Sequence, residues 1–340
     1  MLRKSPTALF LVGLTAIVIA GFGARAAFAN SKSSTTIGNG ILVIEDTLGY
    51  QGGSAAGTGM VLTSSGEVLT NNHVINGSTQ VVAIVPGTSH HYIAKVVGYS
   101  VANDVAVLQL QHASNLKTIT TSSKRPAVGL IVHAVGNAGG TGSLTSAYGT
   151  ISALGKTITA SNDEGSSETL RGLLEVSANV QPGDSGGPLL DGDSHVVGMT
   201  TAASQGNFGY GYAAASVSPD AYAIPIAKAL SVVHLIEAGE RSATIHIGAT
   251  AFMGVEVSSA ARYGSSGAIV AGLVPNGPAA KAGLRAGDVI TKIGDTTVTS
   301  PTAITKIVLS KKPGAKISVT YTRYGERNTL TVTLGSGPPQ

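Results

Sequence analysis

The chain has 340 residues, more than one small domain needs, and this length predicts a leader followed by two compact units. Its formal net charge is only +4, and its Lys and Arg residues are scattered, which argues against the basic stripe that nucleic-acid binding uses. Cysteine is absent, and this excludes disulfides, a thiol nucleophile and thiolate metal sites.

Residues 1–29 have the features of an export leader. Arg3 and Lys4 are followed by an apolar stretch with no further charge until Arg25, and residues 27–29 (Ala-Phe-Ala) form the small-x-small pattern of a signal-peptidase site. The stretch is also long enough to span a bilayer, so a retained membrane anchor is the alternative to a cleaved signal peptide. Either form predicts an exported protein in the periplasm or cell envelope, or a secreted one. Residues 30–40 are predicted to be a flexible lead-in.

Residues 41–238 are expected to form the first domain, and it should be mainly β. Short apolar runs, such as residues 105–110 and 196–199, alternate with glycine-bearing turns, and the chain has 45 glycines and only 12% charged residues. This pattern is typical of a barrel or a sandwich. Near the end of the domain, residues 226–237 carry apolar side chains at helical spacing and predict a closing helix between Pro225 and Gly239.

Three polar residues lie where predicted strands begin or end. His73 follows a strand that ends at Leu69, Asp104 begins an alternating strand, and Ser185 lies in residues 183–188 (Gly-Asp-Ser-Gly-Gly-Pro). A serine hydroxyl becomes a nucleophile when an oriented base removes its proton, and the order His, Asp, Ser is one known order of such a triad. Each residue alone is more often structural, but the three together predict His73 as base, Asp104 as orienting acid and Ser185 as nucleophile.

Glycines beside Ser185 predict where the negative charge of a reaction intermediate would be stabilised. They let the backbone turn tightly enough to aim two N–H groups at one point. We therefore expect the N–H groups of Gly183 and Ser185 to form an oxyanion hole.

Residues 239–250 are the candidate linker, and residues 251–336 are the candidate second domain. This region mixes strands with two short helices, which begin at Pro278 and at Ser300-Pro301, and it ends in a hairpin that turns near Tyr324. The expected class of this domain is α+β.

The chain resembles the HtrA (Deg) family of trypsin-like serine proteases from about residue 41 to residue 334. The resemblance lies in residues 58–62 (Thr-Gly-Met-Val-Leu), 66–75, 103–108 and 183–189, which match the family's signature stretches in order. It implies two six-stranded β-barrels with the active site in the cleft, followed by a PDZ domain. It also implies ATP-independent cleavage of unfolded or exposed protein segments in quality control, and a possible homotrimer. The chain departs from the family at Asp184, where members often carry Asn, and in its short segment 46–56.

Positions carried over from trypsin-like proteases predict the primary specificity pocket. Asn179 stands where trypsin has an acid, so no acid is available there for Lys or Arg substrates. The resemblance implies a pocket for small to medium aliphatic side chains, and its walls are expected from Asn179, Val180, Thr201, Ala202 and Ala203.

Residues 252–256 (Phe-Met-Gly-Val-Glu) and 277–290 resemble PDZ domains. Such domains add a peptide to a sheet edge and hold its C-terminal carboxylate with loop N–H groups. The resemblance implies binding of peptides with apolar C-termini, and the expected peptide-binding residues are Phe252, Met253, Gly254, Val255, Ile304 and Ile307.

Two other functions remain open for the sequence: a chaperone or scaffold with little proteolysis, and a narrow processing protease for one exported partner. The complete set of His73, Asp104 and Ser185 favours proteolysis over the first. No cofactor is expected. The pair His90-His91 has no third ligand at metal-binding spacing, so no metal site is expected either.

Overall fold

The computed structural model describes residues 38–50, 52–161, 167–203, 221–260 and 266–340. The predicted leader (residues 1–29) and most of the lead-in lie outside this range. Within the described ranges, no helix is both long and apolar enough to cross a bilayer. The contacts discussed below all belong to one compact unit, Thr35–Gln340.

Six antiparallel strands form the first barrel. They are β1 (Ile41–Leu48), β2 (Gly53–Val61), β3 (Glu67–Thr70), β4 (Gln80–Ile84), β5 (His91–Ser100) and β6 (Val105–Leu110). Their order is β5-β4-β1-β2-β3-β6, and pairing of β6 with β5 closes the ring. Side chains such as Ile44, Val68 and Leu108 fill its interior, because successive residues of a strand point to opposite faces. Two short helices join these strands, α1 (Asn72–Ile75) and η1 (Val101–Asn103).

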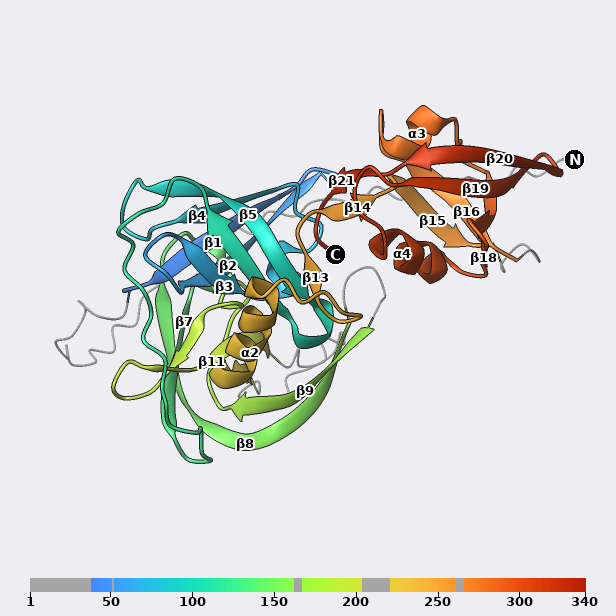
Figure 1. The fold of residues 1–340 in the computed structure, drawn as a ribbon. Helices are drawn as coiled ribbons and strands as arrows, with labels where there is room; N and C mark the ends of the chain where they lie inside the picture. Colours follow the sequence, from blue (N-terminus) through green and yellow to red (C-terminus); the bar gives the residue numbers. More distant parts are fainter. Residues whose placement is uncertain (1–37, 51, 162–166, 204–220, 261–265) are drawn as a thin grey trace, which may run out of the picture. The chain divides into compact units, whose positions relative to one another are not determined.

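Another six strands close the second barrel in the order β10-β11-β12-β9-β8-β7. They are β7 (Ile131–Gly136), β8 (Thr145–Ser161), β9 (Ser167–Val176), β10 (Pro188–Leu190), β11 (Val196–Ala203) and β12 (Ala221–Pro225), and η2 (Ala138–Gly140) follows β7. Strands β8 and β9 make the long curved ribbon drawn in green in Figure 1. The expected pair of six-stranded barrels is confirmed.

Helix α2 (Ile226–Glu237) follows β12 directly, as its sequence pattern predicts. Pro225 has the fixed backbone angle that suits a helix start, and Ala229, Val233 and Ile236 form the buried face. This face contacts β5 and β6 of the first barrel as well as β11 and β12 of the second. The helix therefore ties the two barrels together.

The segment predicted as a linker is partly bound to the first barrel. Strand β13 (His246–Ile247) pairs with β5, with His246 opposite Tyr99 and Ile247 opposite Gly98. The His246 ring also stacks on the Tyr99 ring, with 4.8 Å between the ring centres. A two-residue strand gives no detectable alternation in sequence, which explains why this pairing was not predicted.

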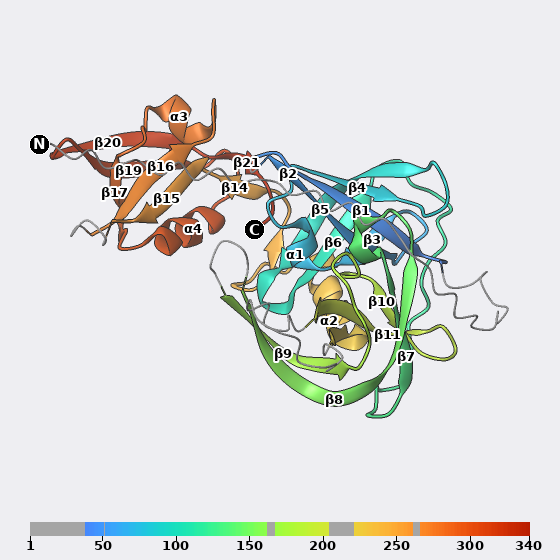
Figure 2. The ribbon, with the colours of Figure 1, turned by 180° about the vertical axis from the view of Figure 1, so that it is seen from behind.

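The C-terminal part has the expected α+β composition and a hydrophobic core of its own. Its elements are β14 (Thr250–Phe252), β15 (Val255–Ser259), β16 (Ala268–Leu273), α3 (Pro278–Ala282), β17 (Val289–Ile293), β18 (Thr296–Thr297), α4 (Pro301–Leu309), β19 (Lys316–Arg323), β20 (Glu326–Thr333) and β21 (Gly335–Gly337). The main sheet has the order β15-β16-β17-β19-β20, which makes β15 an edge strand (Figure 2). Strands β14 and β21 pair separately.

One buried carboxyl group in the first barrel has no hydrogen-bond partner within the described residues. Asp46 on β1 is 2% exposed, and neither of its carboxylate oxygens is paired there. Burial raises the pKa of Asp46 to about 7, although the neighbouring Ser78 hydroxyl opposes this shift. The folded protein therefore holds a proton on Asp46 that an unfolded chain would release near pH 4.

We expect this group to destabilise the fold as pH rises from about 4 to about 7. In that window the folded state binds more protons than the unfolded state, so the free energy of unfolding falls with increasing pH. In Asp46→Asn this pH dependence should be absent. The free energy of unfolding of the variant, relative to that of the wild type, should therefore increase by about 2 to 4 kcal/mol between pH 4 and pH 8. Urea unfolding at both pH values measures it. The exposed acid Asp295 supplies a control, because Asp295→Asn should leave the slope unchanged; an equal slope in Asp46→Asn and the wild type would contradict the prediction.

Candidate active site

His73 lies on the one-turn helix α1, directly after β3 ends at Thr70. Its side chain is 46% exposed, so the ring is open to solvent on one side. Its main-chain N–H donates to Oδ1 of Asp104 at 3.0 Å, and its ring Nδ1 lies 2.9 Å from Oδ2 of the same carboxylate. Asp104 therefore fixes both the backbone and the ring of His73.

Asp104 itself is held in an unusual backbone conformation at the start of β6. Its φ of 51° and ψ of 50° are left-handed, a region that aspartate tolerates better than most residues. The side-chain amide of Asn71 donates to its carbonyl oxygen at 2.9 Å, and the Thr201 hydroxyl donates a short hydrogen bond to Oδ2. Because Asp104 is only 2% exposed, the Thr201 hydroxyl and the two His73 groups take the place of water around the carboxylate, while Asn71 fixes the backbone.

This arrangement determines which nitrogen of His73 can serve as a base. A carboxylate only accepts hydrogen bonds, so the contact at Nδ1 requires the proton of a neutral ring to sit on that nitrogen. The other ring nitrogen, Nε2, then carries the lone pair that a general base uses. Such a ring can take a proton from a nearby hydroxyl group.

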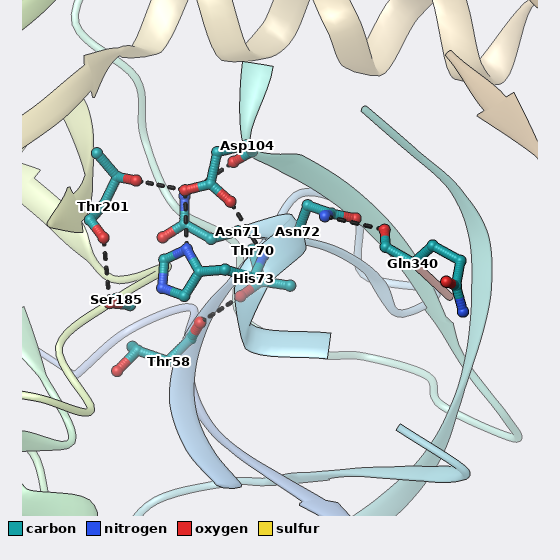
Figure 3. Close-up of polar contacts among 9 residues, drawn as sticks. All are labelled: Thr58, Thr70, Asn71, Asn72, His73, Asp104, Ser185, Thr201 and Gln340. Atoms are coloured by element: carbon teal, nitrogen blue, oxygen red, sulfur yellow. Dashed lines mark hydrogen bonds and ion pairs between the residues drawn. The ribbon is translucent and has the colours of Figure 1, made fainter. Parts of the chain in front are cut away.

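Ser185 is brought to the same place by the loop between the second-barrel strands. Its hydroxyl is oriented toward the carbonyl oxygen of Thr201 at 3.4 Å, so Thr201 contacts Ser185 through its main chain and Asp104 through its side chain (Figure 3). The carbonyl oxygen of Ser185 accepts a hydrogen bond from the N–H of Thr58 on β2 at 2.9 Å. The two barrels thus meet around His73, Asp104 and Ser185.

The glycines around Ser185 are needed for this loop. Gly183 has a φ of +99°, and a Cβ there would lie 2.1 Å from the carbonyl oxygen of Asn137. Its own carbonyl accepts the Thr58 hydroxyl at 2.7 Å, which fixes the peptide orientation. Among the described residues, the N–H groups of Gly183 and Ser185 have no acceptor, so both are available to a ligand.

Asp184 lies buried between these two donors along the chain. Its Oδ2 accepts the N–H of Gln181 at 2.8 Å, whereas Oδ1 has no partner in the described structure. Burial raises its pKa, and the Gln181 hydrogen bond opposes this only in part. An asparagine at this position would accept the same hydrogen bond without the cost of a buried charge.

The residues predicted to line the specificity pocket differ in their surroundings. Asn179 is exposed, and its Oδ1 accepts a hydrogen bond from the Gln181 amide at 2.8 Å. Val180 is buried within the second-barrel core. Thr201, Ala202 and Ala203 belong to β11, but the side chains of the last two lie outside what the structure describes.

The predicted peptide-binding residues lie on the loop between β14 and β15 and on α4. Gly254 has a φ of +75°, and the N–H groups of Met253 and Gly254 have no acceptor among the described residues. Val255 begins the edge strand β15. Ile304 is buried in the core, while Ile307 lines an open surface groove with Thr296, Ala303, Lys306 and Ser310. Phe252 is partly buried, and its ring stacks on Tyr50 at 5.0 Å.

The described residues also bring three potential metal ligands together at the turn between β10 and β11. Asp191, Asp193 and His195 each place a ligand atom within 4.8 Å of the others. The Asp191 carboxylate, however, already accepts the main-chain N–H groups of Asp193 and His195, at 3.0 and 2.9 Å. These bonds are those of a tight turn.

Sequence reasoning missed two polar partners of the site. Asn71 and Asn72 directly precede His73, yet both are buried, and this departure from the usual exposure of asparagine is visible only in the structure. Thr201 was expected to be a pocket wall, but its hydroxyl donates to Asp104. Polar residues adjoining a candidate catalytic residue are the sequence signal that could have drawn attention to Asn71 and Asn72.

Comparisons with known proteins find a match for each of the two parts of the chain. A trypsin-like peptidase domain matches residues 57–199, and a PDZ domain matches residues 251–334. "Serine protease Do-like HtrA" of Lactococcus lactis is 32% identical over 83% of this chain and 71% of its own length. "Serine endoprotease DegS" of Haemophilus influenzae is 31% identical over 83% of this chain and 77% of its own.

One further relative is much longer than this chain, and one solved structure matches most of the chain. The chain spans about half, 56%, of "Probable periplasmic serine endoprotease DegP-like" of Halomonas elongata, with 30% identity over 83% of this chain. A solved structure described as "HtrA-type protease AlgW with tripeptide" is 29% identical, with a TM-score of 0.48, over 89% of this chain and 95% of that one.

The Thr201 hydroxyl should matter for turnover as well as for stability. Thr201→Val keeps the shape but removes a donor from a buried carboxylate, so we expect kcat for a peptide substrate to fall about tenfold and stability to fall by about 1 to 3 kcal/mol. Thr201→Ser restores the hydroxyl and should recover most of both. Steady-state kinetics and thermal unfolding of the two variants measure this. Equal kcat in Thr201→Val and the wild type would contradict it.

Proposed function

Because the chain belongs to the HtrA family of serine endopeptidases, we propose that it hydrolyses peptide bonds with His73, Asp104 and Ser185 as its catalytic triad. The observation that supports this most strongly is the continuous contact from His73 to Asp104, Thr201 and Ser185. It supplies a base, an orienting carboxylate and a hydroxyl from three distant parts of the sequence. Those are the parts that serine proteolysis requires.

The proposed reaction uses these groups in sequence. The Ser185 Oγ attacks the carbonyl carbon of the substrate while His73 Nε2 takes the hydroxyl proton, and Asp104 stabilises the resulting imidazolium. The N–H groups of Gly183 and Ser185 donate to the developing oxyanion. His73 then protonates the leaving amine, and water releases the acyl group from Ser185 by the reverse proton transfers.

We propose unfolded or exposed segments of exported proteins as the substrates, and quality control in the cell envelope as the role. The Halomonas elongata relative is described as a probable periplasmic protein, and the apolar stretch of residues 1–29 agrees with export of this chain. Whether that stretch is cleaved or kept as an anchor is decided by the N-terminal sequence of the purified protein. The proposed reaction needs neither ATP nor a cofactor, and a homotrimer is the assembly that the family resemblance favours.

The proposed domain division follows the predicted boundaries. Residues 41–238 form the protease domain, 239–250 the connection and 251–336 the PDZ domain. A hydrophobic cluster that begins at Ala251 supports the second boundary, whereas Ile245 of the connection packs into the core of the first domain.

The proposed specificity pocket accepts small to medium aliphatic side chains. The exposed Asn179 carries no charge to pair with Lys or Arg, and its amide is engaged with Gln181. The adjoining Val180 and, on β11, Ala202 and Ala203 are apolar residues that offer no group to pair with a cationic side chain.

Cleavage should depend on Ser185 and not on an exposed serine elsewhere in the chain. Ser185→Ala removes the nucleophile without opening a core cavity, so casein hydrolysis should fall by at least about 10⁴-fold while thermal unfolding is unchanged. Mass spectrometry of wild-type digests should show cleavage after residues such as Val and Ala. The exposed Ser89 provides the control variant Ser89→Ala, which should remain fully active. Casein cleavage by Ser185→Ala at the wild-type rate would overturn the triad assignment.

Peptide binding by the PDZ domain should depend on a free C-terminal carboxylate. In full-length Ser185→Ala, a peptide ending in Val should bind roughly tenfold more tightly than its C-terminal amide, because the Met253 and Gly254 N–H groups favour an anion. Isothermal titration measures both affinities. Gly254→Ala should weaken binding, since its φ is +75° and the new Cβ would lie 3.2 Å from the Phe252 ring.

Gly325→Ala is the matched control for that variant. Gly325 also has a positive φ, +84°, but it lies in the β19–β20 turn with open space around it, so peptide affinity should not change. Equal binding of the free peptide and its amide would contradict carboxylate capture.

A further inference from the structure

Residues 335–340, here called the strap, run from the PDZ domain to the helix that carries His73. The first half of the strap is β21, which pairs with β14 so that Gly337 lies opposite Thr250. Pro338 and Pro339 follow, and both are buried. Proline has few backbone conformations to lose on ordering, so this segment is suited to keep a fixed path.

Two main-chain oxygens in the second half of the strap accept hydrogen bonds, one from the first residue of α1 and one from just after the helix. The carbonyl oxygen of Pro339 accepts the N–H of Gly77, just after the helix, at 2.9 Å. The carbonyl oxygen of Gln340 accepts the side-chain amide of Asn72, within the helix, at 3.1 Å (Figure 3). Beside the strap, the Tyr99 hydroxyl of the first barrel lies 3.2 Å from the Thr250 hydroxyl on β14.

Helix α1 needs such external contacts to keep its position. It has only four residues, and Asn71 at its N-cap makes no capping hydrogen bond. A single turn is unstable in isolation, because nucleation of a helix is unfavourable. One side of the turn is fixed by the two hydrogen bonds from His73 to Asp104. Asn72, which is 2% exposed and adjoins His73, is fixed by the strap.

We propose that the strap is a positioning element for catalysis, which holds the His73 helix in its working place through Asn72 and Gly77. This inference rests on the proposed role of His73 as the general base. Residues 72 and 340 are separated by 268 positions, so the turnover of the protease domain would depend on residues that follow the PDZ domain. Asn72 does not touch the substrate in this proposal; it acts through the placement of His73.

Loss of the strap should lower kcat and leave KM unchanged. A displacement of the base by a fraction of an ångström impairs proton transfer, and misplacement of about 1 Å can cost on the order of 100-fold. The proposed specificity pocket belongs to the second barrel, which the strap contacts do not include. We therefore expect a fall of about tenfold in kcat.

The test compares four full-length or shortened proteins with one fluorogenic peptide substrate. They are the wild type, Asn72→Ala, a chain ending at Gly337, and that shortened chain carrying Asn72→Ala. If the strap acts through Asn72, each single change should lower kcat about tenfold, and the combined protein should be no slower than the shortened chain. Gln340→Ala is the matched control, because it keeps the main-chain oxygen that Asn72 donates to, and its kcat should equal that of the wild type.

Several outcomes separate the possibilities. An unchanged kcat in the shortened chain, or fully additive losses in the combined protein, would overturn the proposal. A rise in KM with kcat unchanged would overturn it as well. If thermal unfolding shows that the shortened chain fails to fold, Asn72→Ala alone decides, since its kcat must still fall with KM unchanged. A wild type without endopeptidase activity would contradict the proposed function itself, whereas an active wild type with an insensitive strap contradicts only this inference.

Discussion

The carboxylate of Asp104 is the group on which the arrangement of the candidate site depends. It is almost fully buried, and a buried charge is tolerated only when hydrogen bonds replace its water. Those hydrogen bonds come from His73 on α1 and from Thr201 on β11, so they require the two barrels to meet in one relative placement. Helix α2 contacts strands of both barrels and maintains that placement. The position of His73 relative to Thr201 thus depends on the packing of α2 against both barrels.

Many elements of the fold could be predicted from sequence because their signals are local, whereas the pair of barrels followed from the family resemblance. Alternating apolar residues and glycine turns indicated short strands, and Pro225 with a helical stripe of apolar residues marked α2 correctly. The candidate site could be predicted in part, since His73, Asp104 and Ser185 stand in a recognisable order at strand ends. The structure adds that Asp104 adopts a left-handed conformation and contacts His73 through two separate atoms.

The remaining contacts depend on register and on long-range packing, which local patterns do not encode. The pairing of β11 with β12 shifts between Thr200 and Ala202, so counting alternate residues along β11 does not reveal that the Thr201 hydroxyl is directed to Asp104. The contact between Asn72 and Gln340 joins residues separated by 268 positions. Residues 239–250 contain too short a strand for its pairing with β5 to be recognised.

That short strand has a consequence for the solubility of the protein. The edge of β5 at Gly98 and Tyr99 would otherwise present unpaired backbone groups, and such an edge is a template on which extended chains aggregate. β13 occupies this position with its own backbone, and the Gly248 N–H adds one further hydrogen bond to Val97. A serine endopeptidase meets extended segments of its protein substrates, and such segments can add to an open edge. Because β13 occupies the edge of β5, no unpaired backbone is left at Gly98 and Tyr99 for strand addition, whereas β15 remains an edge strand of its own sheet.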